Sequence, residues 1–315
     1  MWHGHDGATR MDGLQGPLIV RPGRNFSTPV ITPHDAEHVV FIADHYHALG
    51  APAMAALNRP FAGTPQAGDP ANGAFAWIGN PQSVLINGRA NVSDCAPGNA
   101  TAPATCAVAA LGAEPGAGCG HSVFDVRPGG EYLFRVINAG SLTYQTVCFE
   151  GHNVTIVAAD ARPVAPLAAG PCVDVNVGQR LDVLLRADAD PTRSYWLSSA
   201  VQYRAGGVSG YSVIRYLPAP AALPPTPAPP PGGVAPWTLA QTDSLRSHPV
   251  LGAPRPAGAG PSAADYGAPP EPTIRLGINI SQPILAETGQ IRWALDNVAG
   301  ATSPPCQSVL GILTS

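Results

Sequence analysis

The 315-residue sequence is long enough for more than one domain, and only 12% of its residues are charged. Its formal net charge of −4 at pH 7, without a basic cluster, argues against nucleic acid or an anionic membrane surface as a partner. No apolar run reaches the roughly eighteen residues that cross a bilayer, so the sequence predicts no membrane-spanning segment.

The chain opens on two histidines, His3 and His5, separated only by Gly4. Residues i and i+2 of an extended strand point to the same face, so we expect the two imidazoles to project side by side. Gly4 has no side chain and would let other groups approach them. Imidazole binds copper, zinc, iron and nickel alike, so the pair predicts one metal, or two metals close together, without identifying the metal.

Strand signals dominate the middle of the chain, and no long helical period appears. Short runs rich in β-branched and aromatic residues alternate with turns containing Gly, Pro, Asn or Asp, which is typical of an all-β sandwich. The clearest runs lie at 39–42, 83–86, 132–137, 154–157 and 181–185.

Stretches rich in Pro and Ala follow at 217–237 and 254–272, and we expect them to form extended connectors. Two more strand-like runs, 273–280 and 290–297, come after them. A strand pair cannot form an independent β domain, so these runs are expected to begin a further one.

The residues around the first histidine pair resemble the second histidine motif of the multicopper oxidases, a family that includes laccases and ascorbate oxidases. The sequence here is Trp-His-Gly-His-Asp at 2–6 and Gly-Leu-Gln-Gly-Pro-Leu-Ile-Val at 13–20. Trp-Ile-Gly-Asn-Pro-Gln at 77–82 and Leu-Ile-Asn-Gly-Arg at 85–89 resemble ascorbate oxidases in particular. The resemblance implies cupredoxin-like Greek-key β-sandwich domains and copper as cofactor, with His3 and His5 each ligating one copper of the type 3 pair.

The resemblance also divides the chain. It implies the end of a first cupredoxin domain at 1–30, a complete second, plastocyanin-like domain at 31–217, a linker at 218–271 and the start of a third domain at 272–315. The implied activity is the one-electron oxidation of a small diphenol or enediol reductant, coupled to the four-electron reduction of O2 to water.

Two readings of the chain stay open. The other copper motifs of the family would precede residue 1 and follow residue 315, so the chain is expected to be an internal piece of an oxidase that needs the missing portions of its first and third domains. Its abrupt start on the metal motif, without a leader peptide, favours this interpretation. The alternative is an inactive, truncated cupredoxin-type structural or binding module with weak or no copper affinity.

The resemblance implies a substrate site as well, formed by Trp77, Arg204 and Trp293. Aromatic faces stack on a flat lactone or phenol, and a guanidinium favours an anionic enediol. Each residue also has a structural alternative, since Trp77 could cover a core edge, Trp293 could be buried between strands and Arg204 could be a solvated loop charge.

A second histidine pair, His45 and His47, repeats the i, i+2 spacing. Chemistry alone would propose another metal site there. The family pattern at this place, Asp-Trp-x-His, is not a copper-ligand motif, so we expect no ligand role. The remaining histidines are scattered singly and are expected to be surface or hydrogen-bonded structural residues: His34, His38, His121, His152 and His248.

Six cysteines and an excess of Asn-x-Ser/Thr sites favour a secreted glycoprotein with disulfide bonds. Pairing is open from the sequence alone, although Cys95 and Cys106 flank one loop, and Cys148 and Cys172 lie in strand-like runs that could be neighbours. The resemblance implies a Cys95–Cys106 bridge, gives Cys119 a partner outside the chain and gives Cys306 none. The glycosylation candidates are Asn25, Asn91, Asn99 and Asn279, whereas Asn153 lies in a strand-like run and is expected to be unmodified.

Overall fold

The computed structural model describes residues 1–21, 33–61, 78–90, 121–204, 206–218, 279–281, 283–295 and 298–299. The chain divides into two compact units, one of residues 1–50 and 80–259 and the other of residues 51–79 and 260–315. Nearly all of the regular structure is β, which confirms the all-β fold class. Within the described residues, no helix is long and apolar enough to cross a membrane.

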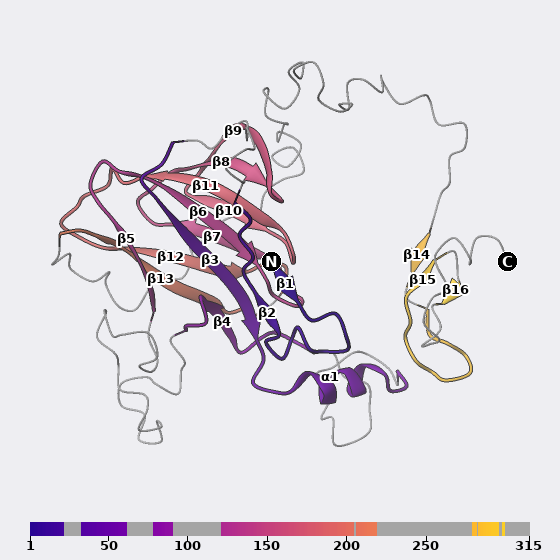
Figure 1. The fold of residues 1–315 in the computed structure, drawn as a ribbon. Helices are drawn as coiled ribbons and strands as arrows, with labels where there is room; N and C mark the ends of the chain where they lie inside the picture. The colour runs from indigo at the N-terminus through magenta and orange to yellow at the C-terminus, as the bar shows by residue number, and fades with distance from the viewer. Residues whose placement is uncertain are drawn as a thin grey trace, which may run out of the picture. The chain divides into compact units, whose positions relative to one another are not determined.

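Six strands of the larger unit form one sheet. They are β3 (Ala36–His45), β4 (Ser83–Ile86), β6 (Glu131–Asn138), β8 (Val154–Ala159), β9 (Arg162–Gly170) and β11 (Arg180–Arg186). Their order is β4-β3-β6-β11-β8-β9, as Figure 1 shows, and β3 runs parallel to β6. The edge strand β9 carries Pro163 and Pro166, which an edge tolerates because one side of its backbone needs no partner.

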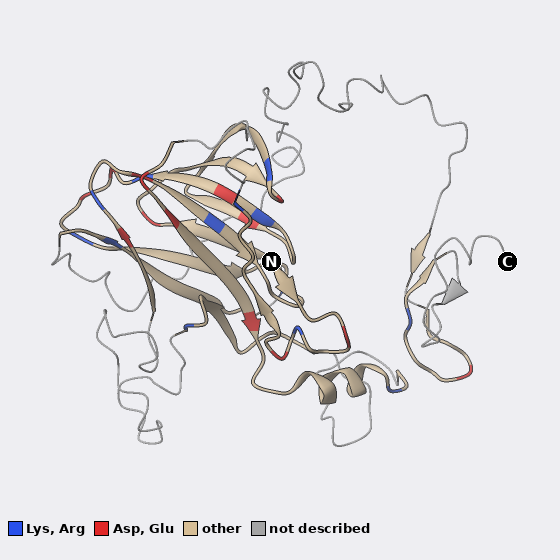
Figure 2. Ribbon diagram, in the orientation of Figure 1, with Lys and Arg blue, Asp and Glu red and all other residues tan. Residues whose placement is uncertain are grey.

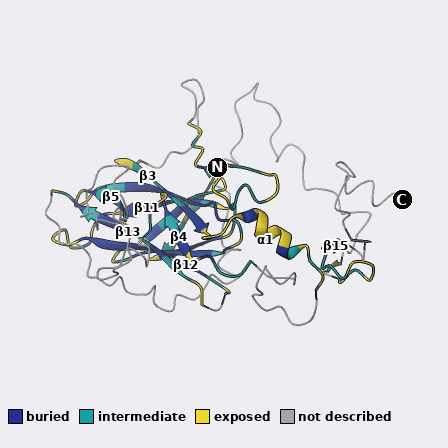
Figure 3. Cartoon of the chain, turned by 90° about the horizontal axis from the view of Figure 1, so that it is seen from below, coloured by how far each residue is buried: buried dark blue, intermediate teal, exposed yellow. Residues whose placement is uncertain are grey.

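A second sheet consists of β5 (Ser122–Val126), β7 (Gln145–Phe149), β10 (Cys172–Val175), β12 (Tyr195–Val201) and β13 (Ser209–Tyr216), in the order β10-β7-β12-β13-β5. Phe134 of the first sheet meets two rings of the second edge-on, with centroids 5.6 Å from Phe124 and 5.4 Å from Phe149. All three rings belong to one buried cluster, so the two sheets pack as a sandwich around a shared apolar core (Figure 3).

The five clearest predicted strands are confirmed, since they fall in β3, β4, β6, β8 and β11. A short helix, α1 (Gly50–Leu57), was not predicted. Its sequence shows no apolar period of 3.6. It is rich in Ala, the strongest helix former, and half of its residues are exposed (Figure 3). Pro52 lies in its first turn, where a missing N–H costs little.

The smaller unit contains a short antiparallel sheet in the order β14-β15-β16, from β14 (Ile280–Ser281), β15 (Ala294–Leu295) and β16 (Val298–Ala299). β15 falls in the strand-like run expected at 290–297. Most of the run expected at 273–280 lies outside the described residues, and so do the connectors beyond Pro218.

Charged side chains link the central strands of the six-stranded sheet, where Figure 2 shows acidic and basic residues on neighbouring strands. Arg135 of β6 bonds Glu37 of β3 at 3.1 Å and Asp182 of β11 at 2.6 Å. Arg21 bonds the same Glu37 at 2.8 Å. These side chains form a network across three adjacent strands rather than isolated pairs.

Candidate metal centre

His3 lies in β1 (Trp2–His3), which pairs antiparallel with β2 (Gln15–Gly16). These two-residue strands are too short to fix the position of the histidines alone. Close packing at two glycines, Gly4 against Thr9 and Gly16 against Trp2, also holds this part of the chain. A Cβ on Gly4 would lie 2.3 Å from Thr9 Oγ1, and a Cβ on Gly16 would lie 2.6 Å from the indole nitrogen of Trp2. Both positions therefore require glycine for the loop to pass this closely.

The structure places the two predicted ligands side by side. The ring centroids of His3 and His5 are 5.8 Å apart and their planes are inclined by 33°. His3 is half-buried and its Nδ1 lies 2.8 Å from the carbonyl oxygen of Gly4, whereas His5 is exposed. A carbonyl oxygen only accepts, so Nδ1 carries the proton and the Nε2 lone pair of His3 remains available to a metal.

The spacing of the two rings fits metal binding. Two imidazoles bound tetrahedrally to one ion, with metal–nitrogen distances of about 2.0 Å, have ring centroids about 5 Å apart. The slightly wider spacing here suits a shared ion after a small ring rotation, or two neighbouring ions with one ring each. The described residues contain no group of three or more His, Cys, Asp or Glu side chains that could hold a metal, so the pair supplies two ligands.

Contacts with distant residues hold the loop that follows the histidines. The Nε–H of Arg10 donates to the carbonyl oxygen of Ala139 at 3.0 Å, and the N–H of Gly50 donates to Asp12 Oδ1 at 2.6 Å. A Cβ on Gly50 would lie 2.2 Å from that of Ala8, so the loop and the start of α1 are in close contact. The sequence analysis missed Arg10 and Asp12, because no local pattern indicates a partner so far along the chain.

A buried carboxylate next to this contact was also missed. Asp44 is 3% exposed and accepts hydrogen bonds from the N–H groups of Ser141, Leu142 and Thr143 and from the Thr143 hydroxyl, at 2.7–3.1 Å. Burial lowers the pKa of Arg10, and the negative charge of Asp44 opposes that shift. The available signal was an acidic residue inside the apolar run Ile42-Ala43-Asp44, where burial requires partners.

The structure also brings His45 and His47 together at the end of β3. Their ring centroids are 5.4 Å apart, with planes inclined by 57°, and both side chains are exposed. They line an open cavity of about 290 Å³ with Met11, Asp12 and the intervening and following residues, Tyr46, Ala48 and Leu49. Burial and the neighbouring His47 lower the pKa of His45, which favours its neutral form.

The described structure does not place the three predicted substrate residues relative to one another. Arg204 is half-buried in the turn between β12 and β13. Burial and the negative charge of Asp44 raise the pKa of Tyr46 to about 12, and the positive charge of Arg204 opposes that shift. Trp293 belongs to the other compact unit and is 66% exposed. Trp77 lies outside the described residues. The substrate site therefore stays a prediction.

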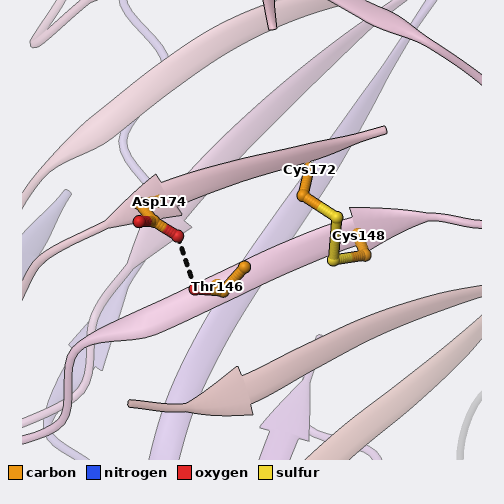
Figure 4. Close-up of a disulfide and its surroundings, with 4 residues drawn as sticks. All are labelled: Thr146, Cys148, Cys172 and Asp174. Atoms are coloured by element: carbon orange, nitrogen blue, oxygen red, sulfur yellow. Dashed lines mark hydrogen bonds between the residues drawn. A yellow bond between two sulfur atoms is a disulfide. The ribbon is translucent and has the colours of Figure 1, made fainter. Parts of the chain in front are cut away.

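Cys148 and Cys172 face each other across β7 and β10 and are joined by a disulfide (Figure 4). The next pair on that face, Thr146 and Asp174, is hydrogen-bonded through the threonine hydroxyl. Asn279 and Asn153 are exposed. The remaining cysteine and glycosylation candidates lie outside the described residues: Cys95, Cys106, Cys119, Cys306, Asn25, Asn91 and Asn99.

The single histidines behave as expected where they are described. Each has a hydrogen-bond partner in the protein: Glu37 for His34, the Asp125 oxygen for His38, the Tyr211 oxygen for His121, and the Glu150 oxygen and Tyr216 hydroxyl for His152. His248 lies outside the described residues.

Comparison with known proteins identifies relatives along the whole chain. L-ascorbate oxidase of Nicotiana tabacum is 27% identical over 303 residues, which cover 95% of this chain and 46% of that protein. Laccase-4 of Thanatephorus cucumeris is 27% identical over 323 residues, which cover 100% of this chain and 51% of that protein. The chain spans about half the length of the curated relatives it matches.

Solved structures with similar folds are also multicopper oxidases and laccases. Fet3p, a multicopper oxidase that functions in iron import, aligns with a TM-score of 0.57 at 16% identity, over 93% of this chain and 44% of its own. Laccase from Botrytis aclada aligns with a TM-score of 0.56 at 20% identity, over 94% and 45%. These likenesses confirm the cupredoxin-like sandwich. The family model for multicopper oxidases matches residues 36–219, more than half of the sequence, and the chain belongs to the multicopper oxidase family.

Proposed function

We propose that this chain forms part of a copper oxidase in which His3 and His5 each ligate one copper of a type 3 pair. The observation that carries the proposal is the side-by-side placement of the two rings, whose centroids are 5.8 Å apart, with His3 oriented by its hydrogen bond to the carbonyl oxygen of Gly4. Imidazole nitrogen is a strong ligand for copper. When bound, copper would supply the redox chemistry that couples one-electron oxidation of a reductant to four-electron reduction of O2 to water.

The residues of this chain hold and orient the imidazoles. The carbonyl oxygen of Gly4 accepts a hydrogen bond from His3 Nδ1–H, and Arg10 and Asp12 attach the loop to the larger unit. Two imidazoles do not complete a coordination sphere, so the proposal assigns the other ligands to protein beyond these 315 residues. The chain covers about half the length of its curated relatives, which supports the proposal that it acts as part of a longer oxidase.

We propose a small diphenol or enediol as the reductant, held by Trp77, Arg204 and Trp293. Support comes from the activities named for the relatives and from the exposure of Trp293, whose ring can stack on a planar ligand. In the complete enzyme, Trp293→Ala and Arg204→Gln should each raise KM for ascorbate about tenfold while copper content is unchanged. An unchanged KM in both variants would contradict this assignment.

The first experiment is metal analysis with mass determination on the protein from its native source. We expect a product much larger than 315 residues, with about four coppers and an intense blue absorption band. In that protein His3→Gln and His5→Gln should each lower the copper content, whereas His34→Gln should not. A 315-residue product with little or no copper would overturn the proposal and leave the inactive cupredoxin-type module.

We also propose that the protein is secreted and glycosylated. The Cys148–Cys172 disulfide supports this, because disulfides persist in oxidising compartments. Asn279 is exposed within an Asn-x-Ser site, where a glycan would face solvent. Treatment of the native protein with an N-glycosidase should lower its mass, and an unchanged mass would count against glycosylation.

A further inference from the structure

The backbone at the end of β3 directs two imidazoles outward together. Tyr46 is 6% exposed and points into the protein, so the residues on either side, His45 and His47, point the other way. The N–H of His47 donates to Gln82 Oε1 at 2.9 Å, which fixes its backbone. The two rings are therefore held on one side of the chain by a buried anchor and a hydrogen bond.

Each ring of this pair keeps a nitrogen available to a ligand. The imidazole of His45 makes no hydrogen bond within the described residues, whereas the ring of each single histidine described there has a protein partner. His47 Nε2 lies 3.2 Å from the hydroxyl of the buried Ser83. When Nε2–H donates to that hydroxyl, Nδ1 keeps its lone pair and faces away from Ser83.

The spacing suits one shared ion. The centroid separation of 5.4 Å is close to the value of about 5 Å for two imidazoles bound tetrahedrally to one metal, and closer to it than the separation of His3 and His5. Asp12 lines the same cavity, so a cation there would lie near a carboxylate. The cavity, about 290 Å³, has room for several waters of about 30 Å³ each to complete the coordination sphere.

We infer that His45 and His47 form a second binding site, distinct from His3 and His5, for a divalent transition metal that prefers imidazole. Nickel and copper are the best candidates among such ions, because they bind nitrogen donors most strongly. Apart from water, every ligand of this site lies within the described residues. It is independent of the proposed oxidase activity.

The test is equilibrium dialysis of the 315-residue chain against Ni²⁺, after a chelator has removed bound metal. The paired substitution His45→Gln with His47→Gln should remove one equivalent of bound nickel. The matched pair His3→Gln with His5→Gln should retain that equivalent, and His34→Gln should change nothing. An unchanged number of equivalents in the His45/His47 variant, or their complete loss in the His3/His5 variant, would overturn the inference.

A second measurement needs no change to His45 or His47 and so does not depend on the folding of that variant. In the His3→Gln/His5→Gln chain, diethyl pyrocarbonate modifies exposed histidines, and mass spectrometry locates the modified positions. Nickel should slow modification of His45 and His47 at least tenfold and leave that of His34 unchanged. Equal modification rates with and without nickel would contradict the site.

Discussion

The side chain of Arg10 is hydrogen-bonded to the backbone of Ala139, with the donor Nε 3.0 Å from the carbonyl oxygen. The two residues are 129 positions apart, and the bond connects the loop after His5 to the end of β6. One guanidinium nitrogen, Nη2, is buried without a hydrogen bond among the described residues, so the contact is retained at a cost. We interpret Arg10 as a positioning residue for the histidine loop.

Replacement of Arg10 by methionine keeps the packing of the side-chain stem and removes the hydrogen bond. The expected result is at least tenfold faster amide hydrogen exchange in residues 4–14, with only about 1 kcal/mol lost from the free energy of unfolding. Hydrogen exchange followed by mass spectrometry measures this. Arg162→Met, at an exposed position of β9, is the matched control. Unchanged exchange in the loop would show that Arg10 does not position it.

Asp44 should be among the most sensitive polar positions in the sandwich. In Asp44→Asn one of the two oxygens becomes an NH2 donor, which would face N–H groups that need an acceptor. We expect a loss of about 2–4 kcal/mol in the free energy of unfolding. Urea unfolding followed by tryptophan fluorescence checks this.

Asp35→Asn is the matched control for Asp44. Asp35 is exposed and accepts one hydrogen bond, from the N–H of Glu131 at 2.8 Å. It should lose less than about 1 kcal/mol, because an exposed donor can bond to water instead. Equal losses at the two positions would mean that burial of Asp44 is not the cause.

Local patterns made the strands and the first histidine pair predictable. Runs such as 154–157 alternate because one face packs in the core, and His3 and His5 lie two residues apart, so both depend on short-range geometry. The partners of Arg10 and Asp44 depend instead on which strands are neighbours, since β3 lies beside β6 across a long sequence separation. The spacing of residues in the sequence does not indicate which strands are neighbours in the sheet.

The second histidine pair shows a different limit. Its spacing was evident, and the expectation against a ligand role came from the family pattern at that position. The sequence could not indicate that the imidazole of His45 lacks a hydrogen bond within the described residues or that Ser83 leaves one nitrogen of His47 available. Those facts depend on the neighbouring strand β4, which pairs with the end of β3.

The Cys148–Cys172 bridge should contribute measurably to stability. It joins residues 24 positions apart, and closing a loop of that length restricts the unfolded chain by about 2–4 kcal/mol. The double variant Cys148→Ala with Cys172→Ala should lose that amount in thermal or urea unfolding. Dithiothreitol should destabilise the unaltered chain and leave the double variant unaffected. A double variant as stable as the unaltered chain would contradict this account.

The Glu37 network predicts acid sensitivity. The Arg135 hydrogen bond, with a further contribution from Arg21, lowers the pKa of Glu37 from its ordinary value of 4.5 to about 2. A carboxyl whose pKa is lower in the folded state stabilises the fold fully above its unfolded pKa. This contribution is lost as the pH falls from about 4.5 through about 2. Glu37→Gln should therefore be less stable than the unaltered chain at pH 7, and the difference should shrink across this window.

The cause of this pH dependence can be separated by a double-mutant cycle with Arg135. In an Arg135→Met background, the main partner of Glu37 is gone, so Glu37→Gln should have a smaller effect on the free energy of unfolding, with a weaker dependence on pH. Unfolding curves at pH 7, 4.5 and about 2.5 in moderate salt give the four values needed at each pH. If the effect of Glu37→Gln falls equally with pH in both backgrounds, the guanidinium of Arg135 is not what lowers the pKa of Glu37.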